Sequence, residues 1–97
     1  MYQILYHRLV FEEDFKKFSK KESEKIINDV KKKLSLDPIA FGKPLSKELK
    51  GYYRLRIQDY RVVYRIKKQQ VEVFVLKVGL RKDFIVYIEA AKRLGLI

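Results

Sequence analysis

Three arginines that a predicted β-hairpin gathers on one face are the residues best suited to chemistry. Two alternating runs, 53–57 and 60–66, flank a short turn, a pattern typical of a hairpin. If the loop is two residues long, Arg56 lies directly opposite Arg61, and Arg54 follows one step along the same face. Like charges across a strand pair repel each other. We therefore expect this face to bind an anion, because the planar guanidinium group matches phosphate oxygens in pairs.

The same alternation assigns the other residues of the hairpin, and those of the next predicted strand, to one or the other face of the sheet. The apolar face, which belongs to the core, consists of Leu55, Ile57, Tyr60, Val62 and Tyr64. We expect Ile66 to pair with Val71 of the next strand. Arg65 then lies opposite Glu72, and this favourable pair removes Arg65 from the candidate anion site. The same register places three apolar residues on the arginine face, where they need cover: Phe74, Leu76 and Val78.

The net charge of +11 is concentrated in the second part of the chain. Residues 1–40 hold nine Lys or Arg against seven Asp or Glu, whereas residues 41–97 hold fourteen against five. The excess therefore lies with the predicted strands. Such an asymmetry favours a polyanionic partner, either nucleic acid or an acidic protein segment.

Size and composition exclude several other kinds of site. The 97 residues are long enough for one modest core, so 1–97 is predicted to be a single domain. The absence of cysteine excludes disulfides and thiolate sites, and a single histidine, His7, argues against a multi-histidine metal site or a catalytic triad. The N-terminus is too charged for a signal peptide or a membrane span, so a cytoplasmic protein is expected.

Periodicity predicts a strand and two helices before the hairpin. Residues 2–6 read as a short strand. A helix from about Arg8 carries an aromatic stripe that we assign to the core: Phe11, Phe15 and Phe18. Ser19 and Glu22 fit a capping box that begins a second helix, which runs to about Leu34. The two helices are expected to form an antiparallel hairpin on a sheet.

The rest of the chain completes an α+β fold. A loop at 39–51 leads into the hairpin, with Leu45 and Leu49 tucked underneath it. The run 71–78 adds the third strand of an antiparallel meander. Asp83 can cap a final helix from Phe84 to about Leu94, whose buried face is Phe84, Ile88 and Ala91.

The order of these elements resembles that of the RelE/ParE superfamily of type II toxin–antitoxin toxins. Two segments carry the resemblance, LKGYYRLRIQDYRVVYRI and VEVFVLKVGLRKDFIVY, and the likeness covers essentially the whole chain. It implies the RelE-like, microbial-RNase-type fold. For the RelE branch it also implies a toxin that enters the ribosomal A site and cleaves mRNA.

The resemblance implies five catalytic residues by position: Arg54, Arg56, Arg61, Arg81 and Tyr87. The first two are commonly lysine in the best-known enzyme of the branch, and Leu80 stands where many relatives have histidine. Tyr52 is the tyrosine expected nearest the arginines. It is assigned to RNA binding together with Lys50 and Lys82.

Cleavage by the RNA's own 2′-hydroxyl group would require neither a metal nor a cofactor. The arginines would neutralise the phosphate and its developing charge, with Arg81 placed to meet the leaving group or the same phosphate. Arginine stays protonated and is a poor base. Tyr87 is the better candidate, because neighbouring positive charge favours a phenolate. The alternative is that Tyr87 stacks on a base or only packs.

The implied partners are the ribosome, mRNA and a cognate antitoxin that is acidic or amphipathic, with no membrane involved. Two other functions remain open at this point. A ParE-like toxin would share the fold and inhibit DNA gyrase without cutting RNA. A non-catalytic basic module would only bind RNA or its antitoxin.

Overall fold

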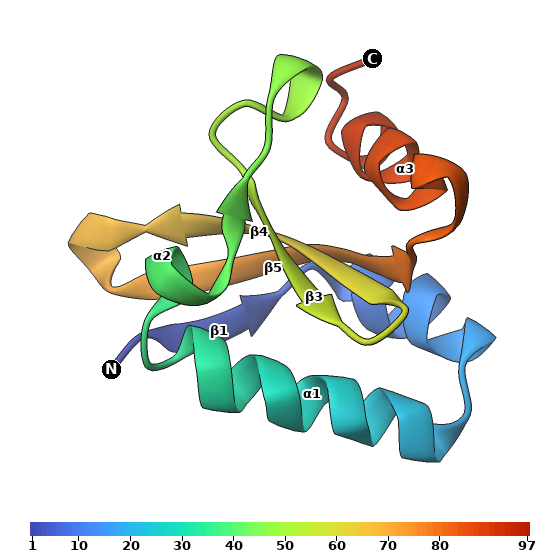
Figure 1. Cartoon of the computed structure of the whole chain (residues 1–97), viewed down its shortest axis with the longest axis horizontal. Helices are drawn as coiled ribbons and strands as arrows, with labels where there is room; N and C mark the ends of the chain where they lie inside the picture. Colours follow the sequence, from blue (N-terminus) through green and yellow to red (C-terminus); the bar gives the residue numbers. More distant parts are fainter.

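The fold is built on one twisted sheet with helices on both sides (Figure 1). In the computed structural model, which describes residues 1–82 and 84–97, five strands pair in the order β1-β5-β4-β3-β2. The strands are β1 (Gln3–Tyr6), β2 (Lys43–Pro44), β3 (Tyr53–Ile57), β4 (Tyr60–Lys67) and β5 (Glu72–Leu80). Strand β1 runs parallel to β5, whereas the other pairs are antiparallel. The predicted α+β class, including the antiparallel meander β3-β4-β5, is confirmed.

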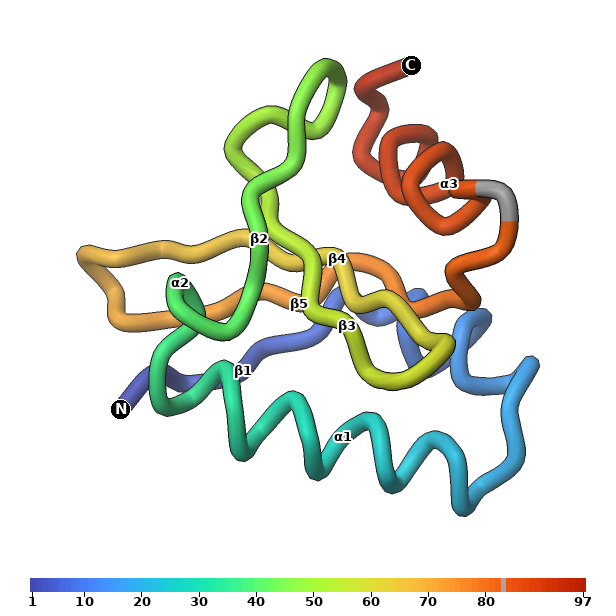
Figure 2. Tube along the Cα trace, viewed as in Figure 1, coloured from blue at the N-terminus to red at the C-terminus, as the bar shows by residue number. Residues whose placement is uncertain are grey.

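The β3–β4 hairpin has the predicted register. Ile57 pairs with Tyr60, and Arg56 lies opposite Arg61. The two-residue turn between the strands is possible because Gln58 adopts the left-handed backbone region, with φ 52°. The turns at the two ends of β4 lie at opposite ends of the sheet (Figure 2).

The turn between β4 and β5 has the predicted length but lies one residue further along the chain, which shifts the register by two residues. Residues Lys68–Gln70 form a 3-10 turn (η4), and Val71 adopts the left-handed region with φ 54°. Because Val71 belongs to the turn, β5 begins at Glu72, which pairs with Lys67. Arg65 lies opposite Phe74. The prediction that Glu72 pairs with Arg65 is therefore wrong.

A β-bulge then reverses the faces of the second half of β5. Val63 pairs with Lys77, but Tyr64 pairs with Val75, so Leu76 is an extra residue in β5. Beyond the bulge the alternation is inverted. Val78 therefore joins the core cluster on the opposite face instead of lying on the arginine face, as the uninterrupted alternation had predicted.

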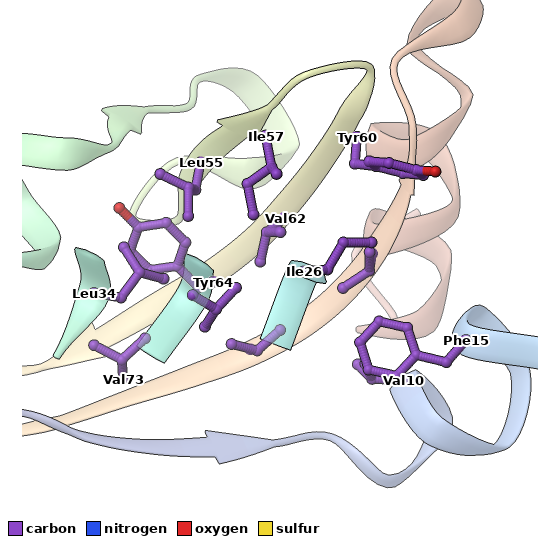
Figure 3. Close-up of a cluster of buried hydrophobic side chains, with 13 residues drawn as sticks. Val10, Phe15, Ile26, Leu34, Leu55, Ile57, Tyr60, Val62, Tyr64 and Val73 are labelled. Carbon is purple, nitrogen blue, oxygen red and sulfur yellow. The ribbon is translucent and has the colours of Figure 1, made fainter. Parts of the chain in front are cut away.

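The main core fills the space between the sheet and α1 (Lys20–Leu34), as Figure 3 shows. Ile26, Val30 and Leu34 of α1 are fully buried there. They pack against the predicted apolar face of the hairpin: Leu55, Ile57, Tyr60, Val62 and Tyr64. Tyr64 donates a hydrogen bond to the Pro38 carbonyl oxygen at 2.6 Å, which satisfies its buried hydroxyl group.

A second, smaller cluster covers the middle of the arginine face. It contains Val63 of β4 with Leu49, Val86, Ala90 and Ala91. Leu45 packs on its border, so the prediction that Leu45 and Leu49 tuck under the hairpin is confirmed. The residues of this cluster on the C-terminal side belong to α3 (Ile85–Arg93). Helix α3 therefore covers part of the face that carries the arginines.

The helical segment after β1 is less regular than its sequence suggests. Val10–Asp14 (η1) has π-helical and Phe15–Lys17 (η2) has 3-10 hydrogen bonding. This change of pitch rotates the aromatic stripe, so Phe15 is buried but Phe11 is 48% exposed. The predicted burial of Phe11 is wrong; Val10 and Asp14 occupy the interior instead.

The predicted start of the second helix is confirmed. Ser19 caps α1, and the Glu22 side chain reaches back to the Ser19 backbone in a capping box. The region predicted as a loop contains short elements: α2 (Pro38–Phe41), β2 and the 3-10 turn η3 (Lys47–Leu49). The Asp37 side chain begins α2 by accepting a hydrogen bond from the Ala40 N–H group at 3.0 Å.

The final helix presents a different face from the predicted one. After the 3-10 turn η5 (Lys82–Phe84), α3 begins at Ile85 and buries Val86, Ala90 and Ala91. Phe84 is 72% exposed and Ile88 is 48% exposed, so their predicted burial is wrong. Phe84 adopts the left-handed backbone conformation, with φ 59°. This interrupts the helical path and rotates α3 about its axis, so that other residues face the sheet. Asp83, the predicted cap, lies outside the described residues.

Candidate functional site

Arg61 lies at the centre of the predicted site and is the most buried of its cations. The residue is only 6% exposed. Its guanidinium Nη1 donates to the carbonyl oxygens of Gln58 at 3.0 Å and Tyr60 at 2.9 Å. These bonds fix the side chain against the hairpin turn, so its remaining donors are held in one orientation. Such preorganisation is what a group that stabilises transient negative charge requires.

Three other arginines and one tyrosine act electrostatically on Arg61. Burial lowers the pKa of the Arg61 guanidinium, and Tyr87 acts in the opposite direction. The positive charges of the neighbours lower this pKa further, in the order Arg56, Arg54 and Arg81. Register and shared grooves bring the five residues predicted as catalytic into one region, although they come from β3, β4, the residue after β5 and α3.

Two adjoining grooves give access to this region, and Tyr87 lines both. One, of about 640 Å³, is lined by Asp59, Arg61, Leu80, Arg81, Lys82, Phe84 and Tyr87. The other, of about 680 Å³, includes Arg54 and runs along the loop between Leu45 and Leu49. An extended ligand that lay across Tyr87 would therefore contact Arg61 on one side and Arg54 on the other.

The cations of the site differ in how far they are neutralised. Arg81 lies 3.6 Å from the Asp59 carboxylate, and both side chains are more than half exposed, at 62% and 78%. Solvent screens such a pair, so Arg81 can exchange Asp59 for a stronger anion. Among the described residues, no carboxylate forms an ion pair with Arg54, Arg56 or Arg61. The arginine face therefore carries uncompensated charge.

The residues predicted to bind RNA have different surroundings. Lys82 is exposed and lines the same groove as Arg61 and Arg81. Lys50 is also exposed, on the loop that precedes β3. Tyr52 is half-buried and packs against the cluster around Val63. Its ring is partly used for packing, whereas both lysines are accessible.

A buried ionic network that the sequence analysis did not anticipate anchors α3, which carries Tyr87. The side chain of Asp14 is fully buried, and its carboxylate accepts from Lys77 Nζ at 3.1 Å and from both terminal nitrogens of Arg93 at 2.8 and 2.9 Å. Burial would lower the pKa of Arg93, but the hydrogen bond and charge of Asp14 raise it. Arg93 is therefore held in its charged form.

The same network closes one edge of the sheet. Strand β1 pairs with β5 only as far as Val75. Beyond that point the Val78 N–H group donates to Asp14 at 2.8 Å, and the Leu76 carbonyl oxygen accepts from Arg93 at 3.0 Å. Two side chains thus occupy the positions of a missing strand. Because Arg93 lies at the end of α3, this closure also fixes the helix against β5.

Two other polar side chains, those of His7 and Tyr60, make contacts within the fold and lie outside the candidate site. His7 accepts a hydrogen bond from the Leu9 N–H group at its Nδ1, at 3.1 Å, and its ring stacks near Phe74. The Tyr60 hydroxyl donates to Glu22, which raises the pKa of Tyr60 and lowers that of Glu22.

The described residues contain no group of three His, Cys, Asp or Glu side chains arranged to bind a metal ion. No helix among them is both long and apolar enough to cross a membrane.

Taken together, these features define a small basic α+β protein whose exposed cations converge on a groove suited to a phosphodiester. A family model, "ParE toxin of type II toxin-antitoxin system, parDE", matches residues 8–84. The chain therefore belongs to this family, within the RelE/ParE superfamily of toxins.

Individual relatives extend the comparison. Over 50 residues the chain is 42% identical to Toxin RelG of Mycobacterium tuberculosis, covering 52% of this chain and 58% of the relative. Over 41 residues it is 46% identical to mRNA interferase toxin RelE of Escherichia coli, covering 42% of this chain and 43% of the relative. The matched segments thus span only about half the length of these curated relatives.

Solved structures support the same fold. The toxin–antitoxin complex RelBE2 of Mycobacterium tuberculosis contains a chain that is 29% identical, with a TM-score of 0.77, over 84% of this chain and 93% of that one. The isolated RelE toxin of E. coli superposes with a TM-score of 0.68 at 24% identity, over 97% of this chain and 99% of that one.

Proposed function

We propose that this protein is a ribosome-dependent mRNA endoribonuclease that inhibits translation as the toxin of a type II toxin–antitoxin system. The observation that carries this proposal is geometric: Arg56 lies opposite the buried Arg61, Arg81 and Tyr87 line one groove with Arg61, and Arg54 lines the adjoining groove with Tyr87. It is supported by the similarity to a relative named as an mRNA interferase. Message held in the ribosomal A site is the proposed substrate.

In the proposed reaction, the 2′-hydroxyl oxygen attacks the adjacent phosphorus and the bond to the 5′-oxygen breaks. Tyr87 is the proposed acceptor of the 2′-hydroxyl proton. The products are a 2′,3′-cyclic phosphate and a 5′-oxygen that leaves with the bonding electron pair, is stabilised by the Arg81 charge and takes its proton from water. Arg54, Arg56 and Arg61 would stabilise the additional negative charge on the phosphorus-bound oxygens.

The ribosome is proposed to supply the alignment that this open site lacks. Both grooves are broad, and Arg54 and Arg56 stand on a solvent-accessible sheet face. An in-line attack requires a fixed RNA conformation, and orienting the reactants can contribute about 7–11 kcal/mol to catalysis. We therefore expect naked RNA to be cut weakly, and message on ribosomes to be cut efficiently.

The proposed partner in the resting state is an acidic or amphipathic antitoxin. Charge complementarity would place it over the arginine face. The exposed apolar side chains around α3, which include Phe84, Ile88 and Ile97, offer a surface for its apolar residues. Covering the arginines would block access to the site, and displacing α3 would remove Tyr87 from it.

Expression in a translating extract tests this function. Wild-type protein should cut ribosome-bound message at defined codon positions, visible by toeprinting. Arg61→Ala and Arg81→Ala should each lower the rate about a hundred- to thousandfold, as expected for the loss of one preorganised donor. Lys20→Ala, at an exposed position on α1, is the matched control. Intact message with the wild-type protein would refute the proposal.

A second function is favoured by the description of the matching family as a ParE toxin. In this alternative, the protein inhibits DNA gyrase and leaves RNA intact. Arg81 and Tyr87 would then have no catalytic role. Inhibition of gyrase supercoiling by the wild-type protein, without message cleavage, would establish this alternative in place of the nuclease.

A further inference from the structure

The turn between β4 and β5 carries a second group of cations. It is separate from the arginine cluster, which consists of Arg54, Arg56, Arg61 and Arg81. A surface hollow of about 580 Å³ is lined by Gly51, Tyr53, Arg65, Ile66, Lys67, Lys68, Gln69 and Gln70. Three of these residues are basic, and none of the described residues lining the hollow is acidic. This turn lies at the end of the sheet opposite to α3 (Figure 1).

The charges of this hollow are accessible and not neutralised within the described part of the chain. Arg65 and Lys68 are exposed. The register shift places Phe74, not Glu72, opposite Arg65, and no carboxylate of the described residues forms an ion pair with Arg65, Lys67 or Lys68. Glu72 lies opposite Lys67 in the strand ladder, so Arg65 and Lys68 are the uncompensated cations of this concave surface, and together they attract an anion.

One side-chain contact and one unusual backbone angle restrain the turn that carries these cations. Lys67 Nζ lies 5.5 Å from the centroid of the Phe74 ring, a cation–π contact that restrains the side chain. Val71 closes the turn with φ 54°, a conformation that a β-branched residue adopts only when the surrounding structure imposes it. The hollow is thus a shaped feature of the turn, in addition to being charged.

We propose that Arg65 and Lys68 form an accessory site for the phosphate backbone of RNA, outside the arginine cluster. This inference rests on the proposed function and names a second contact to the same class of ligand. Arg65 lies on the same sheet face as Arg61, four residues along β4, or roughly 13 Å at the rise of an extended strand. The loop before β3 borders both sites, since exposed Lys47 lines the groove that includes Arg54 and Gly51 lines the hollow.

An RNA backbone fits this hollow better than an acidic protein segment does. Five of its eight lining residues have basic or amide side chains, and the other three are Gly51, Tyr53 and Ile66. The exposed apolar residues that an amphipathic protein would cover, Phe84 and Ile88, belong instead to the region of α3. A polyphosphate chain needs exposed cations and little apolar contact, and Arg65 and Lys68 offer such cations.

The test measures binding of a short 2′-O-methylated RNA, which cannot be cut by this route, as a function of salt concentration. The variant is Arg65→Gln with Lys68→Gln. The control is Lys20→Gln with Lys21→Gln, which removes the same charge from exposed positions at the start of α1, far from the turn (Figure 2). Circular dichroism of both variants verifies that they are folded.

Loss of two phosphate contacts should make the slope of log K against log salt shallower by about 1.4, since each contact to a single strand contributes about 0.7. If the wild-type and variant lines meet near 1 M salt, this slope difference corresponds to binding about 25-fold weaker at 0.1 M. The control should keep the wild-type slope. An unchanged slope in the variant, both with this RNA and with message-free ribosomes, would overturn the accessory site.

Message-free ribosomes and the free RNA distinguish the source of the phosphates. Weaker binding to the RNA alone assigns the site to message, and weaker binding to message-free ribosomes assigns it to ribosomal RNA. If only binding to an acidic polypeptide is weakened, the site is a protein surface and the proposal is wrong.

Cleavage assays keep this inference separate from the proposed nuclease. A wild-type protein that leaves ribosome-bound message intact, while the variant still shows the shallower slope, would refute the nuclease and keep the accessory site. Normal cleavage combined with an unchanged slope would do the reverse. If both stand, the variant should raise KM about 25-fold at 0.1 M salt and leave kcat unchanged, because neither residue contacts the reacting phosphate.

Discussion

Replacement of Asp14 by asparagine should destabilise the protein far more than loss of any exposed charge pair. The Asp14 side chain is fully buried and lies between Lys77 and Arg93, which are 6% and 5% exposed. Asparagine has nearly the same shape, and it can still accept the hydrogen bond from the Val78 N–H group. The substitution therefore removes the negative charge and leaves two buried cations facing each other.

The expected cost follows from the energetics of broken buried ion pairs. Removing one partner of such a pair typically costs about 3–5 kcal/mol, because the remaining charge is left desolvated. Lys77 also lies 3.3 Å from Glu89, which is 43% exposed, and this contact offsets part of the loss. We therefore expect about 3 kcal/mol. For a urea m-value of about 1.5 kcal/mol/M, the unfolding midpoint falls by about 2 M.

Urea unfolding followed by circular dichroism measures this change, and Glu12→Gln is the matched control. Glu12 pairs with Arg8 at 3.0 Å, but the two side chains are 55% and 73% exposed. Such surface pairs contribute less than about 1 kcal/mol. If Asp14→Asn shifts the midpoint no more than Glu12→Gln does, the buried charge does not stabilise the fold and our reasoning is wrong.

Three further predictions concern single residues. Tyr87→Phe should lower message cleavage at least tenfold while binding is retained, and a wild-type cleavage rate would remove Tyr87 as the base. Gly42→Ala should destabilise the protein by about 1–3 kcal/mol, measured by thermal unfolding, because an added Cβ would lie 1.7 Å from the buried Tyr64 hydroxyl oxygen. Burial raises the pKa of Tyr6 to about 12. Stability should therefore hold below pH about 10, the pKa in the unfolded chain, and fall as the pH rises toward 12, since the unfolded tyrosine ionises first. In urea titrations Tyr6→Phe should reduce this alkaline loss, and an unchanged loss would contradict the assignment.

The local elements of the fold could be predicted from the sequence because short-range chemistry determines them. The two-residue turn sets the β3–β4 register, so the opposition of Arg56 and Arg61 followed from spacing alone. The Ser19–Glu22 capping box likewise depends on two side chains three residues apart. In both cases the partners lie within one turn or hairpin, where tertiary packing adds little constraint.

Features that depend on packing between distant segments were not predictable in this way. The bulge at Leu76 inverts the faces of β5, and nothing in an uninterrupted apolar strand marks such an extra residue. Asp14 and Arg93 resemble ordinary solvated residues of amphipathic helices. Their side chains nevertheless form hydrogen bonds in the interior, although the two residues are 79 positions apart in the sequence. The phase of α3 depends on the backbone of Phe84, which periodicity does not encode.

The same limits apply to the candidate site. The convergence of Arg54, Arg56 and Arg61 follows from alternation within the hairpin. Arg81 and Tyr87 were assigned by resemblance, and the structure brings them into the same region through the packing of α3. Their catalytic roles stay predictions. The accessible state of Arg65 could not be foreseen, because it depends on the register that results when Val71 becomes part of the turn.

The closure of the β5 edge by Asp14 and Arg93 has a consequence for self-association. Open strand edges are templates on which further chains add and aggregate. Here the ladder positions beyond Val75 are occupied by side chains, which present no backbone for a second copy to extend. The ionic network therefore acts as a barrier to polymerisation, and a protein that loses it would be expected to form intermolecular β-structure before it unfolds completely.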